Sequence, residues 1–315
     1  MDQAGRKRVA SSRPRHTFLI LKLVSGWLLF LIIIVFMARR LWPENPVVPM
    51  TARTESASKK IESPEDIALL NEAGPICSTN LAGFFAATSP EEQNQFIRTP
   101  IESAPRMARF YSMNPLGTID PKNISIKASA VVHLPGLKAV ETHLQSPDGR
   151  LFDAVFIKEN EEWRLDWEHY ARYSDQPWAL FLSGSGDEEG EFRLLARERL
   201  PEERKSESTI SLILYAPRFG YANDTGFQSP EFLVQRDTRN GKLLDAAFKL
   251  ERDGERVFGV KLPSINPEDL IRVRLKIRRF EVDGERRFEI KDVIACHWYS
   301  VDQPGVEIPE APAPK

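Results

Sequence analysis

The sequence IRVRLKIR at residues 271–278 decides the fold class, because apolar and basic side chains alternate along it with a period of two. This period places neighbouring side chains on opposite faces and predicts a β-strand with one buried and one polar face. Asp283-Gly284 is a two-residue turn signal, so we expect a second strand over residues 285–298. The C-terminal part of the chain therefore contains an antiparallel hairpin.

The register of this hairpin follows from the turn, which sets Val282 opposite Glu285. That register pairs opposite charges and apolar side chains at three further positions: Glu281 with Arg286, Arg278 with Glu289, and Ile277 with Ile290. Cross-strand pairs of this kind stabilise a sheet. Lys276 would face Lys291, and the alternation ends at Asp292-Val293, so we expect a β-bulge there.

Upstream of the hairpin, a helical region precedes a second group of strands. Ser63-Pro64-Glu65-Asp66 and Ser89-Pro90-Glu91-Glu92 are helix starts, with a capping hydroxyl and a proline at the first helical position. Three helices are expected over 64–113, with an interruption of the first near Gly74-Pro75. Period-two patterns then predict four strands of an antiparallel meander: residues 124–132, 138–145, 151–157 and 163–170.

Beyond residue 183 the chain reads as a second strand-rich region. A short helix over 175–182, capped by Asp175 or Ser174, leads to a Gly/Ser/Asp/Glu-rich break. We then expect strands over 191–200, 208–216 and 230–235, and a helix over 237–250, for which a hairpin is the alternative. Runs of helices followed by runs of strands predict an α+β fold.

The predicted domain organisation has six parts. They are a basic tail (1–16), a transmembrane helix (17–38), an extended linker (39–63), a helical and cone-like sheet domain (64–183), a strand-rich α+β domain (184–302) and a Pro-rich disordered tail (303–315).

The charge distribution separates the first 40 residues from the rest. Residues 1–40 hold eight Lys/Arg and one acidic residue, so the remainder holds 35 basic and 44 acidic residues, a net charge of −9. An acidic body argues against nucleic-acid binding, because neutralising phosphates requires a basic surface.

Residues 18–37 form an apolar run of 20 residues that contains one charge, Lys22. At 1.5 Å per residue such a helix spans about 30 Å, the thickness of the hydrocarbon core of a bilayer. The lysine is one turn from the start and can extend to the interface. The run is long for a signal peptide and ends without a small-residue cleavage site. We therefore expect an uncleaved membrane anchor.

The flanking residues predict the orientation of this anchor. Five cations precede it and fewer follow it, and the larger group is expected to stay in the cytoplasm. The N-terminus is then cytoplasmic and the body lies outside the cytoplasm, in the inner (plasma) membrane of a bacterium. The flank residues are Arg13, Arg15, Lys22, Arg39, Arg40 and Trp42.

The sequence carries few signals of catalysis or metal binding. The five histidines make no His-x-x-x-His pair, and no phosphate-binding loop, dinucleotide fingerprint or nucleophile elbow occurs. We expect no metal, no cofactor and no catalytic residue. Cys77 and Cys296 are expected on the oxidising side of the membrane, as two buried thiols or, alternatively, as one disulfide.

Two clusters are candidate binding surfaces. The first is the basic stripe of Arg272, Arg274, Lys276 and Arg278, which would bind an anion, a lipid headgroup or nucleic acid, or would be a solvated face with acidic cross-strand partners. The second is an aromatic pocket, whose alternative is a sheet core anchored by tryptophans. Its residues are Trp163, Asp166, Trp167, His169, Tyr170 and Trp178.

Helices followed by a meander that contains Trp-Arg-Leu-Asp-Trp at 163–167 resemble the nuclear transport factor 2-like cone-fold superfamily over residues 64–183. Many extracytoplasmic members of that superfamily stand behind a single anchor helix, as in assembly factors of bacterial secretion systems. The resemblance implies a cone-like domain. The superfamily's enzymes use an Asp or His base in the cone, where Asp166 and His169 are the nearest matches here. No wider motif carries a catalytic role over to them.

Taken together, these patterns predict a non-catalytic, membrane-anchored interaction or scaffold protein that binds an unknown protein partner or forms a homo-oligomer. The alternative is an anchored small-ligand-binding protein or enzyme that uses the cone around Trp163, Asp166, Trp167 and His169.

Overall fold

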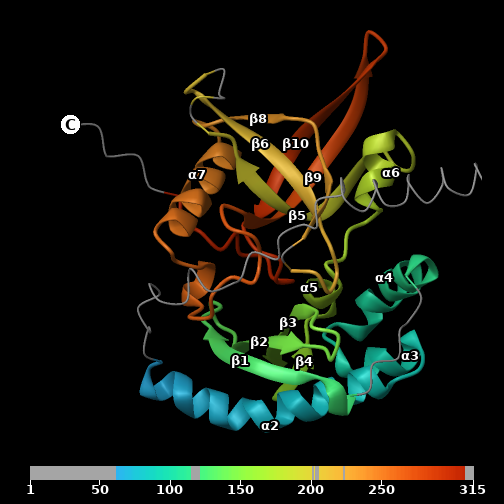
Figure 1. The fold of residues 1–315 in the computed structure, drawn as a ribbon, viewed down its shortest axis with the longest axis vertical. Coiled ribbons are helices and arrows are strands. Elements are labelled where there is room, and N and C mark those ends of the chain that lie inside the picture. The colour runs from blue at the N-terminus through green and yellow to red at the C-terminus, as the bar shows by residue number, and fades with distance from the viewer. Residues whose placement is uncertain (1–61, 115–120, 201, 203–205, 223, 309–315) are drawn as a thin grey trace, which may run out of the picture. The chain divides into compact units, whose positions relative to one another are not determined.

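A computed structural model describes residues 62–114, 121–200, 202, 206–222 and 224–308 of the 315-residue chain. The described residues belong to one compact unit that contains two antiparallel sheets and the helices packed on them (Figure 1). The α+β class expected from the sequence is confirmed. The predicted anchor over 17–38 and all six flank residues lie outside the described residues, and no described helix has the length and apolarity needed to cross a bilayer.

Sheet A is a meander of four strands in the order β1-β2-β3-β4. The strands are β1 (Ser125–Val132), β2 (Ala139–Gln145), β3 (Leu151–Glu159) and β4 (Glu162–Leu165). The first three lie where the period-two pattern predicts them. Across β2 and β3 the pattern puts apolar residues on one face, and on the other it puts Glu141, His143 and Asp153.

Helix α2 (Pro64–Ala86) covers the apolar face of sheet A (Figure 1). Ser63 caps it as expected, and its buried side chains recur at helical spacing: Ala73, Cys77, Leu81, Phe84 and Phe85. The expected interruption near Pro75 is wrong, because the helix continues through it. A residue before proline is disfavoured in a helix through its Cβ, and here that residue is Gly74, which has none.

Three further segments complete the helical region. They are α3 (Pro90–Gln93), the 3₁₀ turn η1 (Asn94–Phe96) and α4 (Pro100–Met113), followed by the 3₁₀ turn η2 (Pro121–Asn123) before β1. Ser89 caps α3 and Asn114 ends α4, as the sequence predicts.

The strand predicted over 163–170 is confirmed only up to Leu165 and is wrong beyond it. Strand β4 stops at Leu165, and α5 (Trp167–Ala171) begins after Asp166, whose carboxylate accepts a hydrogen bond from the amide of His169. Asp166 is therefore a helix cap. Its bond turns the chain away from the sheet, so Trp163, Trp167 and His169 do not share one face of a strand.

Sheet B has six strands, in the order β10-β9-β5-β6-β7 with β8 paired to β6. They are β5 (Glu189–Glu198), β6 (Thr209–Pro217), β7 (Thr225–Gln228), β8 (Phe232–Gln235), β9 (Ile271–Val282) and β10 (Glu285–Ala295). The hairpin register is confirmed pair by pair, from Val282 with Glu285 to Ile277 with Ile290. The bulge is confirmed as well, since Lys276 pairs with Asp292 rather than with Lys291.

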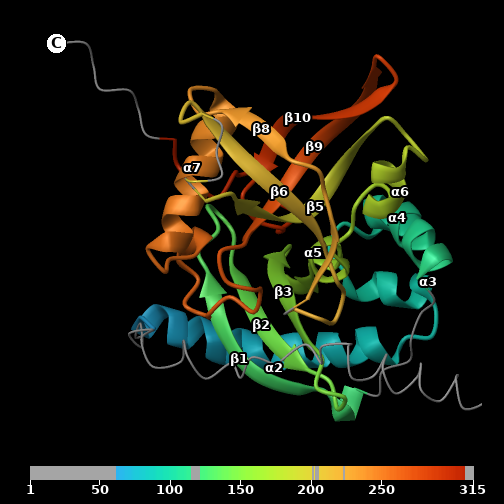
Figure 2. The ribbon, with the colours of Figure 1, turned by 45° about the horizontal axis from the view of Figure 1, so that its top comes forward.

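Two helices pack on sheet B, as Figure 2 shows from a second side. Helix α7 (Arg239–Arg252) confirms the helix expected over 237–250, and it buries Leu243, Leu244, Ala247 and Phe248 against the strands. Helix α6 (Trp178–Ser183) starts three residues later than expected, and its cap position is Pro177, without a side-chain cap. The short turn η4 (Val257–Gly259) follows α7.

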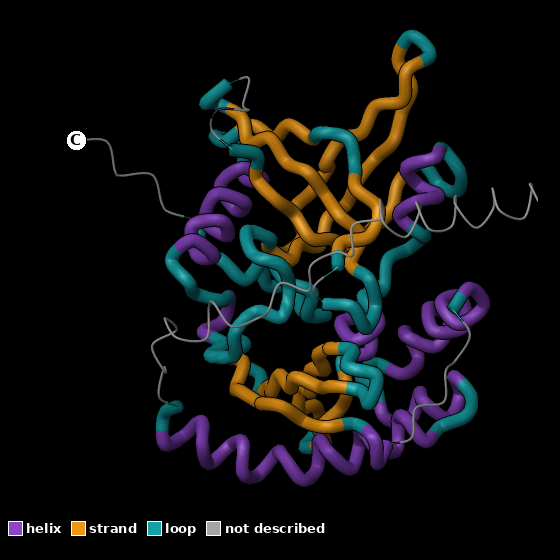
Figure 3. The backbone as a smooth tube through the Cα atoms, viewed as in Figure 1, coloured by secondary structure: helices purple, strands orange, loops and turns teal. Residues whose placement is uncertain are grey.

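Loops gather in the space between the two sheets (Figure 3). One of them is the segment 296–301 directly after β10, which we call the strap. Sheet A and sheet B have separate apolar clusters, and the strap residues Trp298, Tyr299 and Val301 belong to smaller clusters between them. The strap therefore connects the two cores.

Candidate functional site

Sheet A turns a row of ionisable side chains toward sheet B. Glu141 and His143 are two residues apart on β2, and Asp153 is paired with His143 on β3, so all three lie on one face. Glu141 is 0% exposed and Asp153 is 3% exposed. Carboxylates that are buried to this extent require positively charged or hydrogen-bonding partners, because a buried unpaired charge is very costly.

Sheet B supplies the partners from the face that carries the even-numbered residues of β9. Arg272 and Arg274 come from β9, Arg193 lies beside Arg274 on β5, and Arg256 precedes η4. Arg272 reaches Asp153 and Arg256 reaches Glu141 on sheet A, whereas Arg274 bonds to Glu191 on β5 and to the strap. We call the group formed by Glu141, Asp153, Arg172, Arg256 and Arg272 the inter-sheet cluster.

Glu141 is held by Arg256 and by the strap. Nη2 of Arg256 donates to both carboxylate oxygens at 2.9 and 3.0 Å, and the Tyr299 hydroxyl donates at 2.6 Å. Burial would raise the pKa of Glu141, but Arg256, the neighbouring His143 and Arg272 outweigh it and hold the pKa well below the usual range. Glu141 is therefore ionised at neutral pH.

Asp153 is surrounded in the same way. Arg272 donates to it at 2.6 Å, Nε2 of His169 lies 3.0 Å from the same oxygen, and Nη2 of Arg172 lies 3.7 Å from the other oxygen. Burial opposes ionisation, yet Arg272, His169 and Arg172 keep the pKa of Asp153 well below normal. Arg272 and Arg172 also stack against the ring of Trp298 in the strap.

A second group of ionic contacts fixes the other side of the strap. Arg193 is 2% exposed and donates to the carbonyls of Trp298 and Tyr173, to Glu168 at 2.7 Å and to the hydroxyl of Ser300. Asp166 accepts hydrogen bonds at 2.7 Å from both the amide and the hydroxyl of Ser300. The strap thus links Asp166, which follows sheet A, to Arg193 on β5 of sheet B.

The residues of the predicted aromatic pocket are all buried, with exposed fractions of 1–6%. Trp163, Trp167 and Tyr170 pack in the core under α2, and Asp166 and His169 point to the strap and to Asp153. Trp178 is separate from them, because it packs on Phe181 and Phe192 in the core of sheet B. The structure therefore does not bring the six side chains together around one opening.

The basic stripe of β9 divides into two halves. Arg272 and Arg274 are bonded inside the molecule, Arg274 to Glu191 and to the carbonyls of Tyr299 and Val301. Lys276 and Arg278 are exposed, and Lys276 pairs with Glu189 at 2.7 Å. The first half is thus part of the contact between the sheets rather than an exposed surface for a lipid headgroup.

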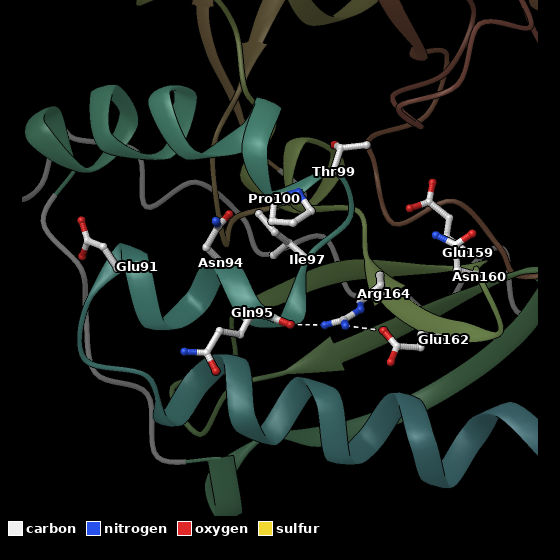
Figure 4. A pocket seen from close by; sticks show the side chains of 10 residues that line it. All are labelled: Glu91, Asn94, Gln95, Ile97, Thr99, Pro100, Glu159, Asn160, Glu162 and Arg164. Atoms are coloured by element: carbon white, nitrogen blue, oxygen red, sulfur yellow. Dashed lines mark hydrogen bonds and ion pairs between the residues drawn. The ribbon is translucent and has the colours of Figure 1, made fainter.

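A groove of about 490 Å³ opens on the surface beside sheet A (Figure 4). Its walls come from α3, η1, the start of α4 and the turn between β3 and β4. The guanidinium of Arg164 bridges the carbonyl of Gln95 and the carboxylate of Glu162 across its floor (Figure 4). Glu159 beside it is paired with Arg98. Arg164, Glu162 and Glu159 at this groove thus form ion pairs within the molecule.

Two chemical features complete the description. Cys77 and Cys296 are free buried thiols, and burial raises the pKa of each to about 12, so neither is a nucleophile at neutral pH. Within the described part of the chain, no group of three His, Cys, Asp or Glu side chains is arranged to hold a metal ion.

Sequence reasoning missed Glu141, Asp153, Arg193 and Arg256. The available signal was a charged residue inside an otherwise apolar strand, as with Asp153 in LFDAVFI and Arg193 in EFRLLA. Such a residue on a buried face requires a partner of opposite charge.

No protein-family model, curated protein or solved structure matches this chain. The resemblance of residues 64–183 to the nuclear transport factor 2-like superfamily therefore stays a prediction.

Proposed function

We propose that this chain is a single-pass membrane-anchored interaction protein of the bacterial cell envelope, with its α+β body outside the cytoplasm. One observation carries the non-catalytic part of the proposal. The ionisable side chains nearest to a catalytic pattern, Asp166 and His169, are buried and are bonded to the strap and to Asp153. Groups held in this way are positioned to stabilise the body rather than to meet a substrate.

Exposed apolar side chains support a role in binding a partner. Ile101 at the start of α4 is 89% exposed and Phe227 on β7 is 67% exposed. Large apolar residues on a surface are typical of sites of protein contact when they gather in patches. These two positions lie on different elements, α4 and β7, and serve as two independent probes for a partner.

Fractionation of membranes tests the anchor. The full chain is expected to stay in the membrane pellet after carbonate extraction, and external protease is expected to cleave the body in cells with a permeabilised outer layer. Deletion of residues 18–37 is the matched control and should release the chain to the supernatant. A full-length chain that stays in the supernatant without detergent contradicts the anchor.

Photo-crosslinking in intact cells tests the interaction. A crosslinking amino acid at Ile101 or Phe227 is expected to give a discrete adduct in the membrane fraction, and the exposed position Asp253 serves as control. An adduct with twice the mass of the chain identifies a second copy as the partner. The absence of any adduct at both apolar positions contradicts the interaction function.

A further inference from the structure

The charges of the inter-sheet cluster do not balance. Three guanidiniums (Arg172, Arg256 and Arg272) stand against two carboxylates (Glu141 and Asp153), an excess of one positive charge before either nearby histidine is counted. The neighbouring group around the strap is different, because Arg98, Arg106 and Arg193 stand against Glu159, Glu168 and Asp166. The excess is thus present in the inter-sheet cluster and absent from this neighbouring group.

Arg172 is the guanidinium with the weakest compensation. Its side chain is 3% exposed, and its Nη2 lies 3.7 Å from Asp153, which is too far for a hydrogen bond. Nη1 donates to the carbonyl of Arg218, while Nη2 has no hydrogen-bond partner in the structure. Burial and the nearby Arg272 together lower the pKa of Arg172 to about 10.

A second unpartnered donor lies on the neighbouring guanidinium. Nη2 of Arg272 is buried and has no hydrogen-bond partner, although Nε and Nη1 of the same side chain bond to Asn266 and Asp153. Both guanidiniums contact Asp153 and stack on one ring, that of Trp298, at 5.4 and 4.7 Å. Two buried guanidinium nitrogens without a hydrogen-bond partner therefore belong to side chains that share one carboxylate and one aromatic ring.

We propose that Arg172 and Arg272 bind one small monovalent inorganic anion, of which chloride is the representative, between the two sheets. The two free guanidinium donors provide its hydrogen bonds, and its single negative charge cancels the single excess positive charge. Water would satisfy the donors but would leave the charge unbalanced, and a buried unbalanced charge is costly. The proposed anion is small rather than bulky and organic, because the two side chains are only 3% and 10% exposed.

The position of Arg172 in the backbone agrees with a role for its side chain. Arg172 ends α5 in the left-handed conformation, with φ of 52°. Glycine is the usual residue at such a helix end, and a side chain there is disfavoured. The guanidinium contacts offset this conformational cost.

The test measures stability as chloride replaces gluconate at constant ionic strength and pH, with the full chain in a non-ionic detergent. A ligand that binds only the folded state raises the unfolding temperature by mass action, so we expect a rise that saturates with chloride. Arg172→Met leaves two guanidiniums for two carboxylates and is expected to remove the chloride dependence. Arg278→Met changes net charge equally at an exposed position and should respond as the unmodified protein does.

Line broadening in ³⁵Cl nuclear magnetic resonance gives a second measurement on the unmodified chain. The protein is expected to broaden the chloride line beyond the effect of Arg172→Met, and bromide should reverse the broadening by competition. An unfolding temperature that is the same in chloride and gluconate overturns the proposal. An equal chloride response in Arg172→Met overturns it too, and absent broadening does so even where that variant fails to fold.

Discussion

The imidazole of His297 lies in the strap against Gly305, with Nε2 2.7 Å from the carbonyl oxygen of Gln303. The rings of Phe258 and Tyr299 pack on it. Burial lowers the pKa of His297 from 6.5 to about 3, and the nearby cations Arg274 and Arg193 act in the same direction. This side chain therefore stays neutral in the folded protein at pH values where it is charged in the unfolded chain.

This difference makes stability depend on pH. Between pH 6.5 and about 3 the unfolded state binds a proton at His297 that the folded state does not, so stability falls as the pH falls. We expect His297→Phe to flatten the slope of unfolding free energy between pH 6.5 and 4.5, which one such group sets at up to about 1.4 kcal/mol per pH unit. Urea unfolding at pH 7, 6 and 5 measures it.

The carboxylates of the inter-sheet cluster affect stability in a lower pH range than His297 does. The pKa values of Glu141 and Asp153 are lowered from 4.5 and 3.8, so the stability they contribute is complete above those values and is lost as the pH falls further. Equal slopes above pH 4.5 in the His297→Phe variant and in the unmodified protein would contradict the role of His297.

At the scale of elements, the contact between α7 and β8 depends on one glycine. Gly241 is the third residue of α7, and a Cβ there would lie 2.1 Å from the carbonyl oxygen of Gln235. The obstacle is backbone at the end of β8, which cannot move aside as a side chain does. The helix therefore reaches its position on sheet B because this residue has no side chain.

Gly241→Ala is expected to destabilise the protein by about 2 kcal/mol, the usual cost of forcing extra volume into a packed contact. Lys242→Ala, one residue further along the same helix and exposed, should change stability little. Urea midpoints of the two variants make the comparison. A Gly241→Ala protein as stable as Lys242→Ala would show that the helix can shift without cost.

The elements that the sequence predicts well are those whose pattern is local. The hairpin register can be predicted from the Asp283-Gly284 turn and the alternating pattern alone, and α7 can be predicted from its apolar stripe alone. Helix α5 was missed because the strand period of β4 continues by chance through Trp167 and His169. The bond that overrides it joins Asp166 to a backbone amide, which residue types alone do not reveal.

The candidate site was predictable only in part, because its partners are far apart in the chain. Arg256 and Glu141 are 115 residues apart, and Tyr299 and Glu141 are 158 residues apart. A buried carboxylate in a strand indicates that a cation must be near, yet it does not say which of the 43 Lys and Arg residues that is. The alternating stripe that contains Arg272 predicts either an external ligand or a solvated face with cross-strand acidic partners, and neither identifies its buried partner Asp153, which lies on the other sheet.

For the whole molecule, the question is whether the two sheets unfold together. Arg193 contacts Glu168 on one side and Trp298 and Ser300 of the strap on the other, and every one of its side-chain nitrogens donates a hydrogen bond. The separate apolar cores of the sheets would otherwise be free to melt independently. Because of these contacts, we expect the two sheets to unfold in a single transition.

Arg193→Met is expected to cost about 3 kcal/mol, because it removes one partner of a buried ion pair. It should also split unfolding in urea into two steps, seen as circular dichroism and tryptophan fluorescence curves that no longer coincide. Lys276→Met, on the neighbouring strand and exposed, is the control. Coincident curves with an unchanged midpoint in Arg193→Met would contradict this role of Arg193.

The place of the strap in the chain has a consequence for how the protein is made. Ser300 follows Asp166 by 134 residues, and ribosomes produce the chain from its N-terminus. Asp166 and Glu168 thus emerge well before the backbone and hydroxyl groups that will bond to them. The bonds of Asp166 and Glu168 to the strap can therefore form only after translation has passed residue 300, so the last step in completing the contact between the sheets is expected to follow synthesis of nearly the whole body.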